Sequence, residues 1–363
     1  MLNNFISSND EEKSCELKDK LELLDCMLAD SKKQSSLYKP GPYWAKRTVK
    51  AVSEIKRCGI SEFRGSSNHI GMSFADNLFI DTRNEYNFGF RRLIRVLTRT
   101  YPLSKICEAQ LQWTVSYANE SIAYAQEILN LKGRTRYLLE KYTVPYSLLG
   151  KCMRKARIDG HEYSIHYLNL LEQHDNIAKK INFKAARSIF EIGGGFGINV
   201  HLLLTNYKNI RKVLYLDIPP NLYIGTQYLK AFHPAAVRDY SSLKSCKEIR
   251  FSENDDLEIL CVAPWQIEMF KSPVNVFMNS HSFVEMPQSV VKNYVKNFNA
   301  FPGAEDAAVA LATYDQYDSG KTLAPTDLPI FFNARKFDHY GAETLLDSSR
   351  KNLYFVSPGK LYF

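Results

Sequence analysis

The sequence lacks the features that mark secreted, membrane-spanning and disulfide-stapled proteins. Its seven cysteines are odd in number and scattered, and none forms a C-x-x-C pair. A disulfide framework or a zinc knuckle is therefore disfavoured, and reduced thiols are the expectation. The first residues show no basic start followed by an apolar run, and no later stretch approaches the ~18 uninterrupted apolar residues of a membrane-spanning helix. We expect a cytoplasmic protein with no membrane span.

The length and composition indicate a folded protein of some size. The chain has 363 residues, of which 45% are hydrophobic and 24% are charged. This is too long for one ordinary core and too apolar for disorder, so one large or two modest domains are expected.

The positive charge is concentrated in one part of the chain. The formal net charge is +8, and the segment 83–157 alone holds 14 basic and 5 acidic residues, a surplus of +9. A surface for phosphate or carboxylate and a solvated helix face both fit this pattern. The chain has no recognisable RNA- or DNA-binding signature and no run rich in Lys and Arg. Nucleic acid is therefore the less favoured partner, and a small anionic ligand fits at least as well.

The chain divides by pattern into three parts. Residues 1–38 are predicted to form a polar arm with one amphipathic helix, because leucines recur at helical spacing from Leu17 to Leu28. The stretch Lys39-Pro-Gly-Pro-Tyr-Trp44 cannot continue that helix, and it opens a mainly helical region, 39–144, expected to act as a lid or substrate domain. Its predicted helices cover 45–58, 86–99, 104–117 and 119–131, with a loop over 63–81. The third part is 145–363.

The third part alternates strands and helices. After a helical region at about 161–181, the stretch from Ala186 to Leu204 reads as a strand, a glycine-rich turn and a helix. Further predicted strands cover 212–216, 258–263, 274–278 and 307–313, and predicted helices cover 219–232 and 287–299. Repeated β-α units predict an α/β fold, with a Rossmann-like, doubly wound and mostly parallel sheet.

The glycine-rich turn indicates a ligand that approaches the backbone closely. Glycine allows backbone conformations closed to other residues, and the helix that follows directs its free N–H groups at a polar or anionic ligand. The dinucleotide fingerprint fails here, because Ile198 stands where a third glycine or alanine is needed. The pattern that fits is an acid followed by alternate glycines, Glu191-x-Gly193-x-Gly195-x-Gly197. Asp217 ends the next predicted strand, where an acid accepts hydrogen bonds from both ribose hydroxyls.

This loop resembles that of class I S-adenosylmethionine-dependent methyltransferases. The stretches Tyr215-Leu-Asp-Ile-Pro-Pro-Asn-Leu-Tyr-Ile-Gly-Thr-Gln-Tyr-Leu229 and Asn279-Ser-His-Ser-Phe-Val-Glu-Met-Pro287 resemble the bacterial putative sugar O-methyltransferase family over roughly residues 145–340. The resemblance implies S-adenosylmethionine as cofactor and a sugar hydroxyl as acceptor, in surface-polysaccharide or modified-sugar biosynthesis. It also implies which residues bind the cofactor. Glu191, Gly193, Gly195 and Gly197 would bind the methionine moiety, Asp217 and Ile218 would bind the ribose and adenine, and Asn279 would also belong to the cofactor site.

Methyl transfer to a hydroxyl requires alignment of the reacting atoms and a group that accepts the hydroxyl proton. His281 follows the predicted strand 274–278, at the carboxyl edge where ligands bind in such sheets, and it is the histidine best placed as this base. It could equally cap a helix or satisfy a core carbonyl. Glu285 could orient His281, bind a sugar hydroxyl or be the base itself. It could also be an acid stabilised by the dipole of the helix 287–299.

Other candidates rank lower. His201 is expected to be a packing residue, Trp265 could stack on adenine or pack, and Tyr163, Ser164 and His166 could cover the cofactor or acceptor. Asp315, Asp318 and Asp338 could bind hydrated Mg²⁺, but no ligand spacing requires a metal.

Two other activities share these features. A nicotinamide-dependent sugar oxidoreductase would use the same fold, and the missing third glycine argues against it. A nucleic-acid methyltransferase acting on RNA would explain the basic segment. A non-catalytic binding module is disfavoured because both cofactor motifs are intact. The basic surplus favours an acceptor that is anionic or linked to a nucleotide, since arginine binds such groups with two parallel hydrogen bonds.

Overall fold

The structure is a computed structural model. It describes residues 15–65, 134–145, 148–152, 155–314, 323–332, 335–343 and 351–361. The predicted helices 86–99, 104–117 and 119–131, most of the predicted loop 63–81, and the candidates Asp315 and Asp318 lie outside these residues.

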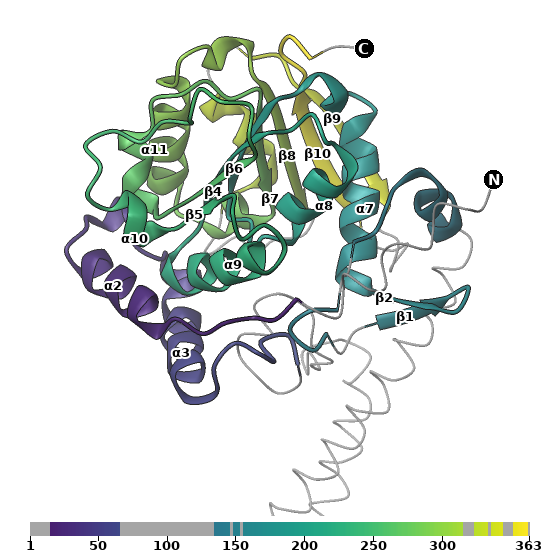
Figure 1. The fold of residues 1–363 in the computed structure, drawn as a ribbon. Coiled ribbons are helices and arrows are strands. Elements are labelled where there is room, and N and C mark those ends of the chain that lie inside the picture. Colours follow the sequence, from purple (N-terminus) through teal and green to yellow (C-terminus); the bar gives the residue numbers. More distant parts are fainter. Residues whose placement is uncertain are drawn as a thin grey trace, which may run out of the picture.

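Within the described residues, the centre of the molecule is a sheet of eight strands in the order β5-β6-β4-β3-β7-β8-β10-β9 (Figure 1). All neighbouring strands are parallel except β10, which runs antiparallel to both β8 and β9. The strands are β3 (Ser188–Ile192), β4 (Lys212–Leu216), β5 (Val237–Arg238), β6 (Glu258–Val262), β7 (Val276–Ser280), β8 (Ala308–Tyr314), β9 (Asp338–Glu343) and β10 (Lys351–Ser357).

The strand order confirms the predicted Rossmann-like fold. From β6 to β8 the strands follow the order 3-2-1-4-5 when counted along the chain from β3, with the short edge strand β5 left out. The chain therefore reverses its direction of progress between β3 and β7. In sheets of this kind, ligands bind outside the carboxyl ends of the strands at that switch point.

Helices cover both faces of the sheet (Figure 1). Successive residues of a strand point to opposite faces, so Ile189 and Phe190 of β3 join two separate hydrophobic clusters. One cluster packs under α7 (Ile165–Ala178), α8 (Ile198–Asn206) and α9 (Pro219–Phe232), and the other packs under α11 (Gln288–Asn299). Because both faces are covered, β3 and β6 are buried along their whole length.

The N-terminal elements pack on the same core as the sheet. Helix α2 (Leu21–Lys32) buries Leu23, Leu24 and Met27 in the cluster that contains α9, and Tyr223 of α9 donates a hydrogen bond to Asp19 (3.0 Å). The predicted amphipathic helix is therefore present, although it begins at Leu21 and not at Leu17. Helix α3 (Pro42–Cys58) begins at the Pro-Gly-Pro stretch, close to the predicted 45–58.

Two antiparallel pairs were not predicted from the sequence. The expected helical region at 161–181 begins instead with strand β2 (His161–Ser164), which pairs with β1 (Lys155–Ile158) before α7 starts. Ser164 ends the strand and caps the helix, because its hydroxyl accepts a hydrogen bond from the Tyr167 amide (3.3 Å). The pairing of β9 with β10 was likewise missed.

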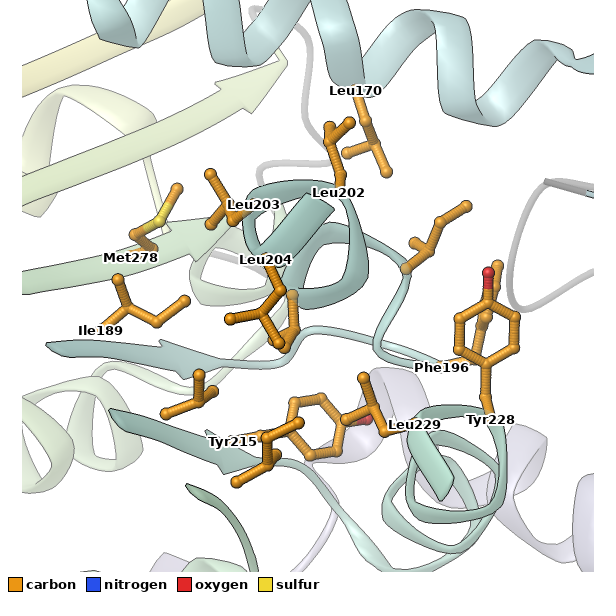
Figure 2. Close-up of a cluster of buried hydrophobic side chains, with 14 of the residues drawn as sticks. Leu170, Ile189, Phe196, Leu202, Leu203, Leu204, Tyr215, Tyr228, Leu229 and Met278 are labelled. Carbon is orange, nitrogen blue, oxygen red and sulfur yellow. The ribbon is translucent and has the colours of Figure 1, made fainter. Parts of the chain in front are cut away.

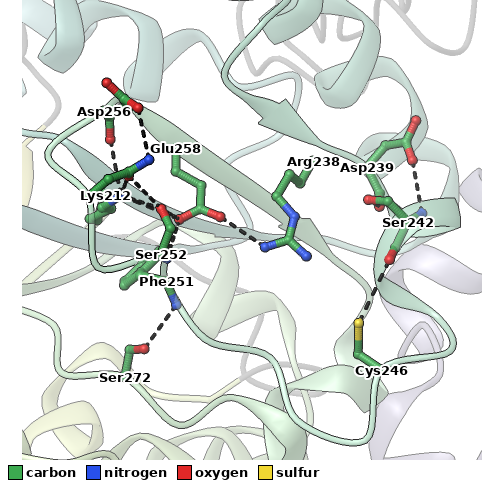
Figure 3. A network of polar contacts seen from close by, with 11 residues as sticks. Lys212, Arg238, Asp239, Ser242, Cys246, Phe251, Ser252, Asp256, Glu258 and Ser272 are labelled. Atoms are coloured by element: carbon green, nitrogen blue, oxygen red, sulfur yellow. Dashed lines mark hydrogen bonds and ion pairs between the residues drawn. The ribbon is translucent and has the colours of Figure 1, made fainter.

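A polar network holds the amino ends of β4 and β6 together (Figure 3). The buried Glu258 carboxylate accepts hydrogen bonds from Arg238 (2.9 Å) and from the Ser252 amide (2.7 Å), and it forms an ion pair with Lys212 (3.5 Å). Burial raises the pKa of Glu258, but these donors and cations outweigh burial, so the pKa lies below its usual value.

Candidate functional site

The glycine-rich turn connects β3 to α8 at the switch point. Gly193, Gly195 and Gly197 all have positive φ angles, between 63° and 83°, which side chains with a Cβ rarely adopt. Gly197 is the N-terminal cap of α8, so the first N–H groups of that helix face the space above the loop. The predicted strand, turn and helix are confirmed.

The loop is also packed too tightly for side chains. A Cβ on Gly193 would collide with the Ser282 side chain, which lies in the turn after β7. A Cβ on Gly194 would lie 2.5 Å from the Glu191 carboxyl and 2.9 Å from the Tyr215 ring. Gly194, which the motif leaves free, is therefore required by packing in this chain.

Glu191 is almost completely buried, with 1% of its surface exposed. Its Oε1 accepts a hydrogen bond from the Asn199 amide of α8 (2.7 Å), whereas its Oε2 is buried without a partner among the described residues. Burial raises the pKa of Glu191 to about 7, with the Asn199 hydrogen bond acting in the opposite direction. A buried oxygen without a donor is costly, so this carboxyl is ready to accept a proton or a donor from a ligand.

Asp217 lies at the carboxyl end of β4, beside the glycine loop. Its Oδ2 accepts a hydrogen bond from the Gly195 amide (2.8 Å) and its Oδ1 accepts one from the Ile218 amide (2.7 Å). Burial raises its pKa to about 7, although both amides favour the ionised form. The Asn221 side chain also hydrogen-bonds to this carboxylate, and a carboxylate with three donors can still accept a hydrogen bond from a ligand. The neighbouring Tyr215 hydroxyl donates to the Gly195 carbonyl (2.5 Å) and braces the loop.

Asn279 connects the end of β7 to the glycine loop. Its Nδ2 donates to the Ile192 carbonyl (2.8 Å) and to Ser282 (2.6 Å), and its Oδ1 accepts from the Phe283 amide (3.1 Å). These bonds use its amide to fix the turn after β7 against the turn after β3. A direct contact between Asn279 and a cofactor remains a prediction.

Phe196 anchors the glycine loop through the contacts of its buried ring. Its buried ring meets Tyr228 of α9 edge-on (centroids 5.0 Å apart; Figure 2) and also meets Phe63 (5.1 Å). The Arg64 guanidinium lies 5.0 Å from the centre of the ring and donates hydrogen bonds to the Leu149 carbonyl (3.1 Å) and to Ser164 (2.7 Å). The N-terminal segment and the region around 150 therefore support the loop together.

His281 lies at the switch point with a strained backbone. Its φ of 63° is unusual for a residue other than glycine, and its amide donates to the Ala312 carbonyl (2.7 Å). Its ring stacks on Tyr314 (5.4 Å between centroids, 6° between planes). Burial lowers the pKa of His281 to about 4, with a further contribution from His166, so the ring is neutral at pH 7.

Glu285 lies one turn after His281, between β8 and α3. Its Oε2 accepts a hydrogen bond from the Trp44 indole (2.8 Å), and its Oε1 lies 3.4 Å from the Tyr314 hydroxyl. Burial raises the pKa of Glu285 to about 7, against the opposing effects of the Trp44 hydrogen bond and the Arg47 charge. A carboxyl with this pKa exchanges its proton near neutral pH, as a general base must.

The lower-ranked candidates have structural roles in the described residues. His201 stacks on Phe232 (3.8 Å) and contacts His233 (3.2 Å between ring nitrogens), which confirms the packing role expected for it. Trp265 meets Tyr240 edge-on, and Asp338 forms an ion pair with Lys180 (2.9 Å). Within the described ranges, no group of three His, Cys, Asp or Glu residues could hold a metal ion.

His166, by contrast, lies at the site. Its ring meets Phe196 edge-on, and its charge acts on His281. Tyr163 lies in β2, with its half-buried ring facing His161.

Several basic residues of the segment 83–157 already face acids. The pairs are Arg134 with Glu172 and Glu343, Arg136 with Asp159, Lys141 with Asp175, Lys151 with Glu62, and Lys155 with Glu162. These cations are satisfied within the protein, which favours the solvated-face interpretation for this part of the surplus. Arg91, Arg92, Arg95 and Arg99 lie outside the described residues.

Sequence reasoning missed the contribution of α3. Tyr43, Trp44 and Arg47 meet Glu285 across more than 230 residues, and no local pattern signals such a contact. Ser282 and Tyr215 were missed as well. The alternation of β4 held a signal for Tyr215, because it points to the same face of the sheet as Asp217.

Comparison with known proteins identifies no family. No family model matches the sequence, and neither does any curated protein. Among the solved structures that match is the mitomycin 7-O-methyltransferase MmcR, 12% identical, with a TM-score of 0.35 over 53% of this chain and 55% of that one. The pyocyanin biosynthetic protein PhzM is also 12% identical, with a TM-score of 0.36 over 53% and 56% of the two chains.

The match thus spans little more than half the length of those two proteins. The PH0226 protein from Pyrococcus horikoshii OT3 is 10% identical, with a TM-score of 0.36 over 54% of this chain and 92% of that one. At these scores the fold assignment rests on the strand order and register described above. In the described part of the chain, no helix is both long and apolar enough to cross a membrane.

Proposed function

We propose that this protein is an S-adenosylmethionine-dependent O-methyltransferase. The observation that carries the proposal is the arrangement of Glu191 and Asp217, two buried carboxyls on either side of a glycine loop with positive φ angles, at the switch point of the sheet. Such a loop leaves room for a ligand only above its backbone, and both acids favour a ligand that carries hydrogen-bond donors.

The residues present fit this cofactor. The orphan Oε2 of Glu191 suits an ammonium group such as that of the methionine moiety, and the remaining acceptor capacity of Asp217 suits a ribose hydroxyl. The half-buried Ile218 follows directly and could pack against an adenine ring. Gly193, Gly195 and Gly197 would line the methionine moiety with backbone alone.

Glu285 is the general base that the geometry favours. S-adenosylmethionine, when bound, would supply an electrophilic methyl group to the acceptor oxygen, and the electron pair of its carbon–sulfur bond would stay on the departing sulfur. Glu285 accepts the proton that the acceptor hydroxyl loses, because its carboxylate form predominates above its pKa of about 7. His281 is the second candidate, and its neutral ring could accept the proton if the acceptor reaches a ring nitrogen.

The acceptor in this proposal is a sugar hydroxyl, as the resemblance of residues 145–340 implies. The exposed Arg47 lies over the Tyr43 ring (4.2 Å), and its charge acts on Glu285. No acid forms an ion pair with Arg47 among the described residues, so it is available for the phosphate of a nucleotide-linked sugar or for a carboxylate. A role in polysaccharide or modified-sugar biosynthesis follows if such a sugar is methylated.

Calorimetry tests the cofactor assignment. S-adenosylhomocysteine and S-adenosylmethionine should bind, whereas NAD should not, because the dinucleotide spacing is broken at Ile198. Binding of NAD in preference to S-adenosylhomocysteine would support the sugar oxidoreductase instead and would overturn the proposal.

Methylation of three sugars tests the acceptor. Uridine diphosphate glucose and glucose 1-phosphate should be methylated better than methyl glucoside, and rising salt should weaken that preference because exposed charges are screened over ~10 Å. Arg47→Glu should raise KM for the two anionic sugars and leave cofactor binding unchanged. Methylation of RNA with a steep salt dependence, and of no sugar, would favour the nucleic-acid methyltransferase.

A further inference from the structure

Helix α3 reaches the candidate catalytic carboxyl from a distant part of the sequence. The Trp44 indole nitrogen lies 2.8 Å from Oε2 of Glu285, across 241 residues of chain. Oε1 lies 3.4 Å from the Tyr314 hydroxyl, which is a long and weak hydrogen bond, and the Tyr43 hydroxyl also acts on this carboxyl. The two oxygens of Glu285 are therefore not equivalent.

The position of α3 is fixed by backbone packing. A Cβ on Gly41, the residue that caps α3, would lie 2.7 Å from Cδ of Pro287. The chain can approach the segment after Glu285 this closely only because residue 41 is glycine. Pro42 then starts the helix, which places Trp44 within its first turn beside Glu285.

The groups around Glu285 come from three elements. Tyr43, Trp44 and Arg47 face it from α3, Tyr314 faces it from β8, and His281 stacks on Tyr314 from its own turn. Arg47 is held by its hydrogen bond to the Tyr43 hydroxyl (2.7 Å) and not by the carboxylate itself. Among these groups, the Trp44 indole is the one that donates to Oε2 of the carboxylate, at 2.8 Å.

We propose that Trp44 is a positioning residue: its indole N–H holds Oε2 of Glu285, so that Oε1 takes the proton from the acceptor hydroxyl. The proposal rests on the proposed function, and it adds the reason why this chain needs α3 at the site. An indole has one donor and no acceptor, so it stabilises the ionised carboxylate without competing for the proton. Tyr314, at its longer distance, can give way to an acceptor oxygen.

The indole N–H resonances of the three tryptophans test the contact directly. In ¹⁵N-labelled protein, one of the three should shift with pH, with a midpoint near 7, and it should be the resonance that Trp44→Phe removes. In Glu285→Gln that shift should be absent. A Trp44 resonance that does not titrate, or that titrates equally in Glu285→Gln, would overturn the proposal. If Trp44→Phe does not fold, comparison of the wild-type protein with Glu285→Gln still decides, and Trp265→Phe identifies one of the other resonances.

The effect of the contact on Glu285 separates positioning from packing. The carboxyl ¹³C resonance of Glu285 is identified as the one that Glu285→Gln removes. In Trp44→Phe, the proton affinity measured from this resonance should be roughly tenfold higher than in the wild type, because the ionised carboxylate has lost a hydrogen-bond donor. Gly41→Ala should act in the same direction, since it pushes α3 away from Pro287. Turnover of the methylated sugars should fall by about tenfold, and its acid limb should move to higher pH.

The binding of S-adenosylhomocysteine keeps the two proposals apart. The affinity for S-adenosylhomocysteine should be equal in the wild type and in Trp44→Phe. If Trp44→Phe loses cofactor affinity as much as it loses turnover, Trp44 only supports the fold. If S-adenosylhomocysteine fails to bind the wild-type protein, the proposed function fails, whereas the Trp44 titration still reports whether the contact exists.

Discussion

Buried carboxylates have opposite pKa shifts at the two ends of the parallel strands. We call the side with the amino ends of these strands the amino edge and the side with their carboxyl ends the carboxyl edge. At the amino edge, Glu258 is surrounded by Lys212, Arg238 and the Ser252 amide, and its pKa lies below the usual value (Figure 3). At the carboxyl edge, burial outweighs the hydrogen-bond donors of Glu191 and Glu285 and raises the pKa of each to about 7. Carboxyls that the fold leaves incompletely satisfied are expected where a ligand or a reaction completes them. The comparison therefore separates a structural edge from the edge where we propose the active site.

The largest expected effect is on turnover at the carboxyl edge. Glu285→Gln should lower kcat by ~10²–10⁴, because the amide cannot accept the hydroxyl proton. Glu258→Gln should leave kcat of the folded enzyme unchanged. Turnover with the sugars named above is the measurement, and a loss of less than about tenfold in Glu285→Gln would transfer the role of base to His281, tested next as His281→Ala.

The next effect is on stability at the amino edge. Glu258→Gln should lower the free energy of unfolding by about 3 kcal/mol at pH 7, because it removes the anion that two buried or half-buried cations face. The native pKa of Glu258 is depressed, so its contribution is present above the unfolded pKa and is lost as pH falls through the native pKa. Urea unfolding at pH 7 and pH 4 should show this loss, and an equal cost at both values would contradict it.

A third effect is on cofactor affinity. Asp217→Asn should weaken S-adenosylhomocysteine binding by roughly 10- to 100-fold at pH 8, since hydrogen bonds to a charged group contribute ~1.5–3 kcal/mol. Because the pKa of Asp217 is about 7, the wild-type protein should lose affinity between pH 8 and pH 6, and the variant should not. Calorimetry at both pH values measures this, and affinity that is unchanged in Asp217→Asn would remove Asp217 from the site.

The smallest expected effect is on stability at pH 8. There, Glu285→Gln should stabilise the protein, whereas Glu258→Gln should destabilise it. The native pKa of Glu285 is raised, so the stability it contributes is present below the unfolded pKa, about 4.5, and is lost as pH rises through about 7. At pH 8, Glu285→Gln should therefore be more stable than the wild type, by about 1 kcal/mol or about 2 °C in Tm. Near pH 4.5 the difference should vanish. Thermal melts that show Glu285→Gln and Glu258→Gln destabilised alike at pH 8 would break the comparison.

The central elements of the sheet were predicted from the sequence more accurately than the elements around them. The strand 212–216 and the helix 219–232 were predicted with the bounds that the structure has, because a short apolar run and a proline at the helix start are local signals. Strand β9 was missed because its exposed, mixed residues carry no clear alternation, and it is defined by its pairing with β10. Strand β2 was read as helix for the same reason, since its partner β1 decides its structure.

The candidate site divides in the same way. Glu191 and the glycines were predicted because they form one contiguous motif. Asp217 was predicted because it ends the next strand, at a fixed spacing from that motif. The partners of Glu285 were not, because Trp44 and Tyr314 reach it through tertiary packing alone. Even within the motif, spacing did not reveal that Asp217 holds the Gly195 amide or that Glu191 lies against Gly194.

The docking of α2 on α9 has a consequence for synthesis of the chain. Leu23, Leu24 and Met27 leave the ribosome about 200 residues before Tyr223 and its neighbours, which cover them in the finished protein. At ~5–20 residues per second this is a delay of roughly 10–40 s, during which an apolar helix face waits without its partner. A shorter delay, over about 130 residues, applies to Phe63 and Arg64, which later support Phe196. Nascent chains of this protein are therefore expected to engage a chaperone early, and the glycine loop should become ordered only when the first and the middle parts of the chain have met.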